Sequence, residues 1–277
     1  MKIFYLIFIM LIAPISAATE STQSFTFGVV PQQAASKLAR LWTPILRYLS
    51  ERSGYTLRFK TTPTIPDFEQ QLIEGQYDLA YMNPYHYVVF HRAPGYQAFA
   101  KEKDKKIKGI IVVRQDSSLQ TIAELKDETL AFPAPAAFAA SILPRAHLNN
   151  ADINITPEYV LSHDSVYHAV ARELYPAGGG VIRTFENVNA KVHAQLRILW
   201  TTQAYTPHAI AAHPRIATEV VHKIAQMMYT MHQTPQGQSL LAQIEFNGIE
   251  AAEDADWDDI RALKIEQLKV PIGTAAQ

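Results

Sequence analysis

The chain has no cysteine among its 277 residues, which excludes disulfides, thiolate metal ligands and a lipid anchor on a cysteine. It has no marked excess of charge either, since 25 Lys and Arg stand against 26 Asp and Glu, for a net charge of −1. A nucleic-acid or membrane-surface partner would favour a basic excess, so neither partner is expected. Beyond the N-terminal region, no segment is long and apolar enough for a bilayer span of ~20 residues.

Motifs of the common enzyme classes are also missing. The chain has no Gly-x-Ser-x-Gly nucleophile motif, no Walker phosphate loop and no His-Glu-x-x-His zinc motif. Its ten histidines are scattered along the sequence. We therefore expect no catalysis and no cofactor, and the alternative is a metal carrier or an enzyme that uses His86, His163 and His208.

The N-terminus has the pattern of a secretory signal. Lys2 precedes an apolar run from Ile3 to Ile12, and the small residues Ser16-Ala17-Ala18 follow. A basic start, a short apolar core and a small-residue cleavage site predict a signal peptide over residues 1–18. We expect an exported protein, located in the periplasm if the source is Gram-negative.

Hydrophobic periodicity predicts an α/β fold. The first part of the chain alternates strands at 24–30, 56–61 and 78–82 with helices that begin at Ala34 and Pro66. This β-α-β-α-β order implies a parallel sheet with right-handed crossovers. The alternation resumes after Asn149 and ends in a helical tail. Two α/β lobes, crossed twice by the chain near 110–114 and 200–206, would place ligands in a cleft at the carboxyl ends of the strands.

The stretch from 129 to 149 is the centre of the predicted site. An apolar run at 129–132 predicts a buried strand, and an alanine-rich helix from Pro135 to Asn149 follows it. The small side chains of Ala136 and Ala137 would leave the first N–H groups of this helix uncovered, which suits an oxyanion. Tight packing against a neighbouring element is the alternative explanation of the same small residues.

Polar and aromatic residues follow two other predicted strands. Tyr81, Asn83 and Tyr85 lie at the end of the strand at 78–82, where the topology favours a ligand, although Asn83 is also suited to cap the next helix. His163 follows a strand that ends at Leu161. It is expected either to donate to an anion in the cleft or to belong to a capping turn.

A glycine run, Gly178-Gly179-Gly180, opens a strand predicted over 178–184. Glycines weaken a strand, so their presence indicates that something approaches the backbone closely. Arg183 near its end offers a planar, permanently charged group that suits a carboxylate or an oxyanion. A structural salt bridge is the alternative role for this arginine.

One protein family is suggested by six pieces of the sequence, namely GVVPQQ (28–33), FEQQLIEGQYDLAYMNPYHYV (68–88), FPAPAAFAASILPRA (132–146), SHDSVYHAV (162–170), AGGGVIRT (177–184) and WTTQAYTPHAIAAHP (200–214). They resemble the phosphate/phosphite/phosphonate-type substrate-binding proteins of ABC transporters. The resemblance implies a type II periplasmic-binding-protein fold, with two α/β lobes joined by a two-strand hinge. It also implies the capture of a small anionic solute for a permease or for a membrane sensor kinase. We expect the protein to be a monomer.

The resemblance divides the chain into lobe 1, residues 24–112 plus 204–277, and lobe 2, residues 113–203. Phosphonate-binding members carry a Ser-Thr-Ser-like hydroxyl cluster where this chain has Pro135-Ala136-Ala137, so the ligand stays open among phosphonates, phosphite-like oxyanions and carboxylates. His163 matches the histidine of that family. The expected ligand-binding residues are Gln32, Tyr81, Asn83, Tyr85, Ala136, Ala137, Ser141, His163, Arg183 and Thr184.

Overall fold

The structure is a computed structural model that describes residues 23–266 and residue 268. The predicted signal peptide lies outside the described residues. No helix in the described part of the chain is long and apolar enough to cross a membrane.

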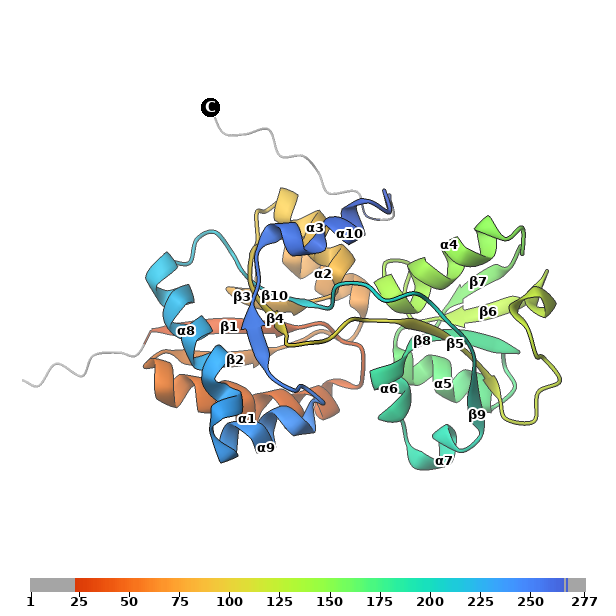
Figure 1. The fold of residues 1–277 in the computed structure, drawn as a ribbon, viewed down its shortest axis with the longest axis horizontal. Helices are drawn as coiled ribbons and strands as arrows, with labels where there is room; N and C mark the ends of the chain where they lie inside the picture. Colours follow the sequence, from red (N-terminus) through yellow and green to blue (C-terminus); the bar gives the residue numbers. More distant parts are fainter. Residues whose placement is uncertain (1–22, 267, 269–277) are drawn as a thin grey trace, which may run out of the picture.

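The first lobe is built on a six-stranded sheet with the strand order β11-β4-β10-β3-β1-β2. Its parallel strands are β1 (Ser24–Val29), β2 (Thr56–Lys60) and β3 (Leu79–Met82), as the β-α-β-α-β pattern predicts. The antiparallel strands are β4 (Gln97–Glu102), β10 (Ala209–Ala212) and β11 (Ile249–Ala251). Helices cover both faces (Figure 1): on one side α1 (Ala35–Ser53), α8 (Thr218–Thr230) and α9 (Pro235–Gln243), and on the other α2 (Ile65–Ile73), α3 (Pro84–Arg92) and α10 (Asp258–Arg261).

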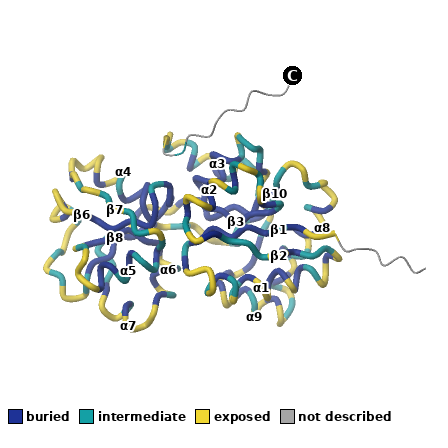
Figure 2. The backbone as a smooth tube through the Cα atoms, turned by 180° about the vertical axis from the view of Figure 1, so that it is seen from behind, coloured by how far each residue is buried: buried dark blue, intermediate teal, exposed yellow. Residues whose placement is uncertain are grey.

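The second lobe is built on a five-stranded sheet with the order β7-β6-β8-β5-β9. Strands β6 (Thr129–Phe132), β7 (Thr156–Tyr159) and β8 (Ala177–Val181) are parallel, and β5 (Gly109–Arg114) runs antiparallel to β8 and β9 (Leu196–Thr201). A π-helical turn η2 (Phe138–Ile142) leads into α4 (Leu143–Asn150) on one face, and the other face carries α5 (His163–Ala171), α6 (Ile182–Glu186) and α7 (Ala190–His193). Figure 2 shows that the central strands of both sheets are buried.

The chain crosses between the lobes twice, over residues 103–108 and 202–208 (Figure 1). The two crossings pair with each other, because Ile107 N donates to Tyr205 O at 2.8 Å and Tyr205 N donates to Ile107 O at 2.9 Å. Strand β5 belongs entirely to the second sheet, where it lies between β8 and β9. The predicted end of the first segment of lobe 1 at residue 112 is therefore wrong, and residues 109–112 belong to lobe 2. Sequence cannot show this, because an apolar strand fits either sheet.

Three predicted elements also differ from the structure. The helix expected from Pro135 starts only at Phe138, as the π-helical turn η2, in which Ser141 N and Ile142 N both donate to Ala137 O. The strand expected over 178–184 ends at Val181, so Arg183 lies on a helix. The helical tail expected at the end of the chain is interrupted by β11 and ends in a 3-10 turn η4 (Asp254–Trp257) and the short α10.

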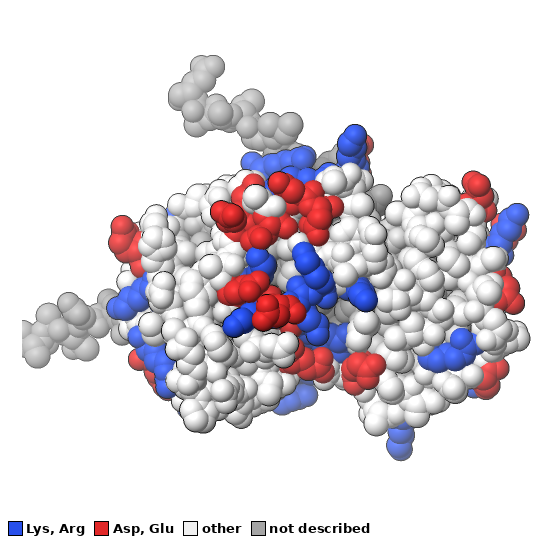
Figure 3. All heavy atoms as spheres, in the orientation of Figure 1, with Lys and Arg blue, Asp and Glu red and all other residues white. Residues whose placement is uncertain are grey.

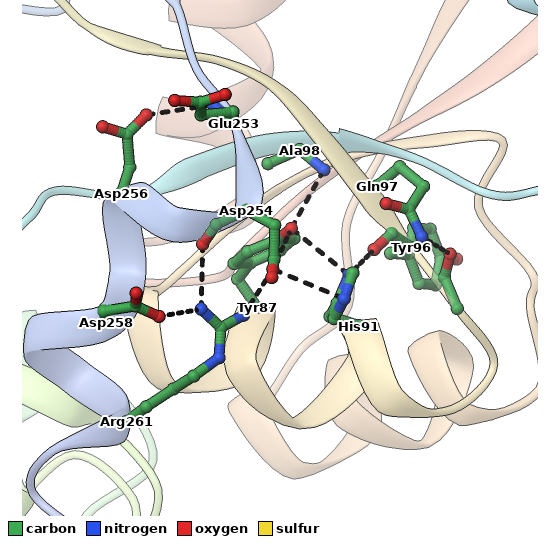
Figure 4. Close-up of polar contacts among 11 residues, drawn as sticks. Tyr87, His91, Tyr96, Gln97, Ala98, Glu253, Asp254, Asp256, Asp258 and Arg261 are labelled. Atoms are coloured by element: carbon green, nitrogen blue, oxygen red, sulfur yellow. Dashed lines mark hydrogen bonds and ion pairs between the residues drawn. The ribbon is translucent and has the colours of Figure 1, made fainter.

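Polar contacts attach η4 and α10 to α3 (Figure 4). Tyr87 Oη donates to Asp254 Oδ1 at 2.8 Å, and His91 Nε2 lies 3.4 Å from the same oxygen. Arg261 pairs with Asp254 and, at 2.7 Å, with Asp258. From α10, the carboxylate of Asp259 accepts a hydrogen bond of 2.8 Å from the backbone N–H of residue 206. The second crossing is thus held on the first lobe.

Candidate ligand-binding cleft

A small cavity of ≈ 10 Å³ lies between the two lobes, at the carboxyl ends of parallel strands of both sheets. Lobe 1 contributes residues after β1 and β3 together with the start of α2, and lobe 2 contributes residues after β6 and β7 and the last residue of β8. This is the position that the predicted topology favours for a ligand. The lining residues are Val30, Gln32, Ile65, Asn83, Ile107, Ala137, Phe138, Ala139, Ala140, His163, Val181 and His208.

The lobes are in contact around this cavity. Asn83 Nδ2 donates to Ala136 O at 3.2 Å, and His163 N donates to Gln32 O at 3.2 Å. The apolar residues from 134 to 143 belong to lobe 2 in sequence and topology but join the hydrophobic core of lobe 1. The structure therefore describes a closed cleft.

Asn83 has both of the roles considered for it from the sequence. Its Oδ1 accepts a hydrogen bond of 2.7 Å from His86 N and so caps α3, while its Nδ2 makes the contact to lobe 2. Pro84 at the first position of α3 fixes the entry of the chain into the helix. Asn83 is 4% exposed and lines the cavity, and hydrogen bonds at both its Oδ1 and its Nδ2 fix its side chain.

The turn η2 presents backbone N–H groups without partners. Ala137 N donates to Ala134 O at 3.3 Å, whereas the N–H groups of Phe138, Ala139 and Ala140 have no acceptor among the described residues. These three residues line the cavity and open a helical stretch that continues through α4. The N-terminus of a helix with free N–H groups is a favourable place for an anion.

Glycines allow this turn to lie directly on the second sheet. A Cβ on Gly109 would come within 1.9 Å of Ala139 O, and a Cβ on Gly179 would come within 1.9 Å of Ala140 O. The glycine run predicts that something approaches the backbone closely, and this is confirmed. The approaching group is the protein's own backbone, so both explanations of the alanine-rich stretch hold: small residues pack tightly, and the packing leaves the N–H groups uncovered.

His163 lines the cavity as a neutral imidazole. Burial lowers the pKa of His163 to about 3. Its Nδ1 lies 3.0 Å from Thr184 Oγ1, and that hydroxyl donates to Val181 O at 3.1 Å and contacts Tyr167 Oη at 2.7 Å. Thr184 does not line the cavity but orients the histidine ring.

His208 is the second histidine of the cavity. Its ring stacks on Tyr81, with centroids 4.9 Å apart, and its Nε2 is buried without a partner in the described part of the chain. Burial, together with the positive charge of Arg183, holds the pKa of His208 well below its usual value. From the sequence, His208 was considered only as part of a metal site.

Arg183 forms a salt bridge between the lobes, which is the alternative role considered for it. Its guanidinium pairs with Glu102 on β4, donates to Tyr81 Oη at 3.2 Å and lies 4.8 Å above the ring of Phe246. Burial raises the pKa of the Glu102 carboxyl, and the neighbouring Arg183 counteracts this only in part. Arg183 lines an adjoining hollow of ≈ 250 Å³ rather than the cavity itself, and the lysines of the first crossing line the same hollow. Figure 3 shows basic and acidic side chains gathered together between the two lobes.

Of the predicted site residues, the structure brings Gln32, Asn83, Ala137 and His163 to the cavity wall. The others lie elsewhere: Tyr81 supports His208 and Arg183, Ala136 receives the bond from Asn83, and Ser141 is buried without a hydrogen-bond partner in the described chain. Tyr85 points its hydroxyl at the C-terminal segment, where it donates to Ile265 O at 3.4 Å and accepts from Leu268 N at 3.0 Å. Sequence reasoning missed the apolar lining residues Val30, Ile65, Ile107 and Val181, because nothing distinguishes them from core residues.

The histidines considered for a metal site do not form one. His86 is buried behind Asn83, where its Nε2 lies 2.9 Å from Glu69 Oε1. Within residues 23–266 and 268, no group of three His, Cys, Asp or Glu side chains is arranged to hold a metal ion.

Comparisons with known proteins agree with this architecture. The family model for the ABC transporter, phosphonate, periplasmic substrate-binding protein matches residues 27–257. The phosphate-import protein PhnD of Mycolicibacterium smegmatis is 21% identical over 237 residues, which cover 74% of this chain and 71% of that protein.

Two solved structures share the fold. The binding protein component of an ABC phosphonate transporter from Pseudomonas aeruginosa has a TM-score of 0.81 at 15% identity, over 88% of this chain and 86% of that one. PhnD1 from Prochlorococcus marinus in complex with methylphosphonate has a TM-score of 0.78 at 17% identity, over 87% and 97%. The predicted type II periplasmic-binding-protein fold is thus confirmed. The chain belongs to the family of periplasmic substrate-binding proteins of phosphonate ABC transporters, which are binding proteins and not enzymes.

Proposed function

We propose that this chain captures a small phosphonate-class oxyanion, such as methylphosphonate, phosphite or phosphate, between its lobes and delivers it to an ABC permease. The observation that carries the proposal is the set of three free N–H groups of η2, which share one cavity with the side chains of Asn83 and His163. Oxyanions bind well to such converging donors at a helix N-terminus. The similar protein from Prochlorococcus marinus is described in complex with methylphosphonate, which supports this ligand class.

In this proposal the lobes contribute different groups to the ligand. Lobe 2 supplies the N–H groups of Phe138, Ala139 and Ala140 and the imidazole of His163. Lobe 1 supplies the amide of Asn83, which exchanges its bond to Ala136 O for one to the ligand. Opening about the two crossings admits the ligand, and closure completes its hydrogen bonds.

The remaining expectations about location and partners belong to the same proposal. We propose that residues 1–18 are removed on export and that the mature protein acts as a periplasmic monomer. Uptake is favoured over sensing for a membrane kinase because the matching family is described by transport.

Isothermal titration calorimetry of the mature protein with methylphosphonate, phosphite and phosphate tests the proposal. A bound ligand raises thermal stability by RT ln(1 + [L]/Kd), about 2.7 kcal/mol at a hundredfold excess over Kd. His163→Ala is expected to weaken binding at least tenfold, because it removes a polar group from the closed cavity. His168→Ala, on the same helix but outside the cavity, is the matched control. If none of the three anions binds, the proposal is wrong.

A further inference from the structure

The cavity offers hydrogen bonds without any full charge. None of its lining residues is Lys, Arg, Asp or Glu. Its polar groups are the free N–H groups of η2, the side chains of Gln32 and Asn83, and two imidazoles. Burying an ion away from an opposite charge is costly, and the cost rises steeply with the charge of the ion.

The imidazole of His163 presents an acceptor to the ligand. Thr184 Oγ1 has one hydrogen and three polar neighbours, namely Val181 O at 3.1 Å, Tyr167 Oη at 2.7 Å and His163 Nδ1 at 3.0 Å. When this hydrogen goes to Val181 O, the contact with His163 is made by a hydrogen on Nδ1. Because burial keeps the ring neutral, Nε2 in this tautomer has no hydrogen and only accepts. A ligand that carries an O–H group satisfies this nitrogen, whereas a bare anionic oxygen is repelled by it.

The nearest charged side chains do not supply the net positive charge that the cavity lining lacks. Arg183 is paired with Glu102, and Glu102 Oε1 is buried with no partner among the described residues, so this pair adds as much negative as positive charge beside the cavity. His208 is neutral and its Nε2 is likewise unpaired. The other charged or titratable groups around the site are Glu69, Tyr81, His86, Lys105, Lys106, Lys108, Asp164, Tyr167 and Glu245.

Resting on the proposed function, we infer that the cleft selects the singly charged, protonated form of its oxyanion and excludes the doubly charged form. The ligand donates its P–O–H hydrogen to His163 Nε2 and receives the N–H groups of η2 and the amide of Asn83 on its remaining oxygens. Thr184 is then a positioning residue for specificity, because its hydroxyl determines which nitrogen of His163 faces the ligand.

Phosphorus-31 NMR of bound methylphosphonate tests this directly, since the chemical shift reports the protonation of the ligand itself and not that of any protein group. Alkylphosphonates lose their second proton near neutral pH, as phosphate esters do at about 6. Between about pH 5 and about pH 9 the bound signal is expected to stay at the position of the monoanion while the free signal moves. The apparent affinity should fall about tenfold per pH unit once the free ligand is a dianion, because only the protonated fraction binds.

Methanesulfonate has the same single charge and shape but no O–H group. At a pH where methylphosphonate is a monoanion, methanesulfonate should bind at least tenfold more weakly. Thr184→Val frees the ring of His163 to place a hydrogen on Nε2, so the difference in affinity between methylphosphonate and methanesulfonate should shrink. Thr184→Ser keeps the hydroxyl and should preserve this difference in affinity.

The outcomes separate the inference from the proposed function. Bound methylphosphonate at the chemical shift of the dianion, or methanesulfonate binding as tightly as methylphosphonate in the wild type, overturns the inference and leaves the proposed function standing. If Thr184→Val and Thr184→Ser prefer methylphosphonate over methanesulfonate by the same factor, the role of Thr184 is overturned. A complete lack of binding of methylphosphonate, phosphite and phosphate at every pH overturns the proposed function, and the inference with it.

Discussion

The salt bridge between Arg183 and Glu102 should govern how firmly the cleft closes. Arg183 lies on α6 of lobe 2 and Glu102 on β4 of lobe 1, so their pairing exists only while the lobes are together. Glu102 is 2% exposed, and the side chain of Arg183 is 27% exposed. Removing one partner of a buried pair costs about 3–5 kcal/mol, because the other charge is left buried and unpaired.

For Arg183→Met we take the lower end, about 3 kcal/mol, since the arginine is partly solvated in the wild type. This cost falls on the closed form, in which Glu102 lacks water. The affinity for methylphosphonate is therefore expected to fall about a hundredfold. Calorimetric titration at neutral pH measures the loss, and Arg172→Met, which changes an exposed arginine of the same lobe, is the control.

A second substitution tests the physical reason. Arg183→Met combined with Glu102→Leu removes both charges, and the apolar pair should regain most of the affinity, because no buried charge is left without a partner. If the double variant binds as weakly as Arg183→Met alone, or if Arg183→Met binds as the wild type does, the role of the salt bridge in closure is refuted.

Three further expectations follow. Gly179→Ala should lower the free energy of unfolding by about 1–3 kcal/mol and weaken ligand binding, since its Cβ would come within 1.9 Å of a carbonyl oxygen of η2; Gly248→Ala, whose Cβ meets only side-chain atoms at 3.3 Å and beyond, should be nearly neutral in urea unfolding. Burial acts to raise the pKa of Asp78, but hydrogen bonds from Thr26 and a neighbouring arginine outweigh it and hold the pKa below the usual 3.8. A depressed pKa means that the stabilisation is complete above pH 3.8 and is lost as the pH falls further, so Asp78→Asn should show a shallower acid loss of stability than the wild type, and equal loss would contradict this assignment. N-terminal sequencing of periplasmic protein should start at Thr19, and an intact first methionine would rule out cleavage.

Local patterns predicted the elements of this fold well where one physical signal dominates. The strand at 129–132 and the capping turn considered for His163 are both found, because a short apolar run is sufficient for the first and the Ser162 cap for the second. The strand predicted through Arg183 failed because the glycines mark close packing against η2 and α5, and this packing does not indicate where the strand ends. Helix α6, which follows Val181, has no side-chain cap at its N-terminus, so the sequence contains no signal for its start.

The site was less predictable than the fold, because its chemistry depends on contacts between distant segments. Asn83 and His163 were identified since they follow strands at the expected edge of a sheet. The partner of Arg183 was not, because Glu102 lies 81 residues away in the other lobe. The hydrogen-bond donors best placed to bind an anion are the backbone N–H groups of η2. Backbone groups have no sequence signature beyond the small side chains next to them.

The apolar seam between residues 134–143 and the core of lobe 1 has a consequence for the rate of release. Closure buries this seam with or without a solute, so part of the free energy of closure does not depend on the ligand. A bound solute leaves only when the lobes separate and the seam is exposed to water again. The protein should therefore empty slowly, which suits a carrier that keeps its solute until it reaches a permease.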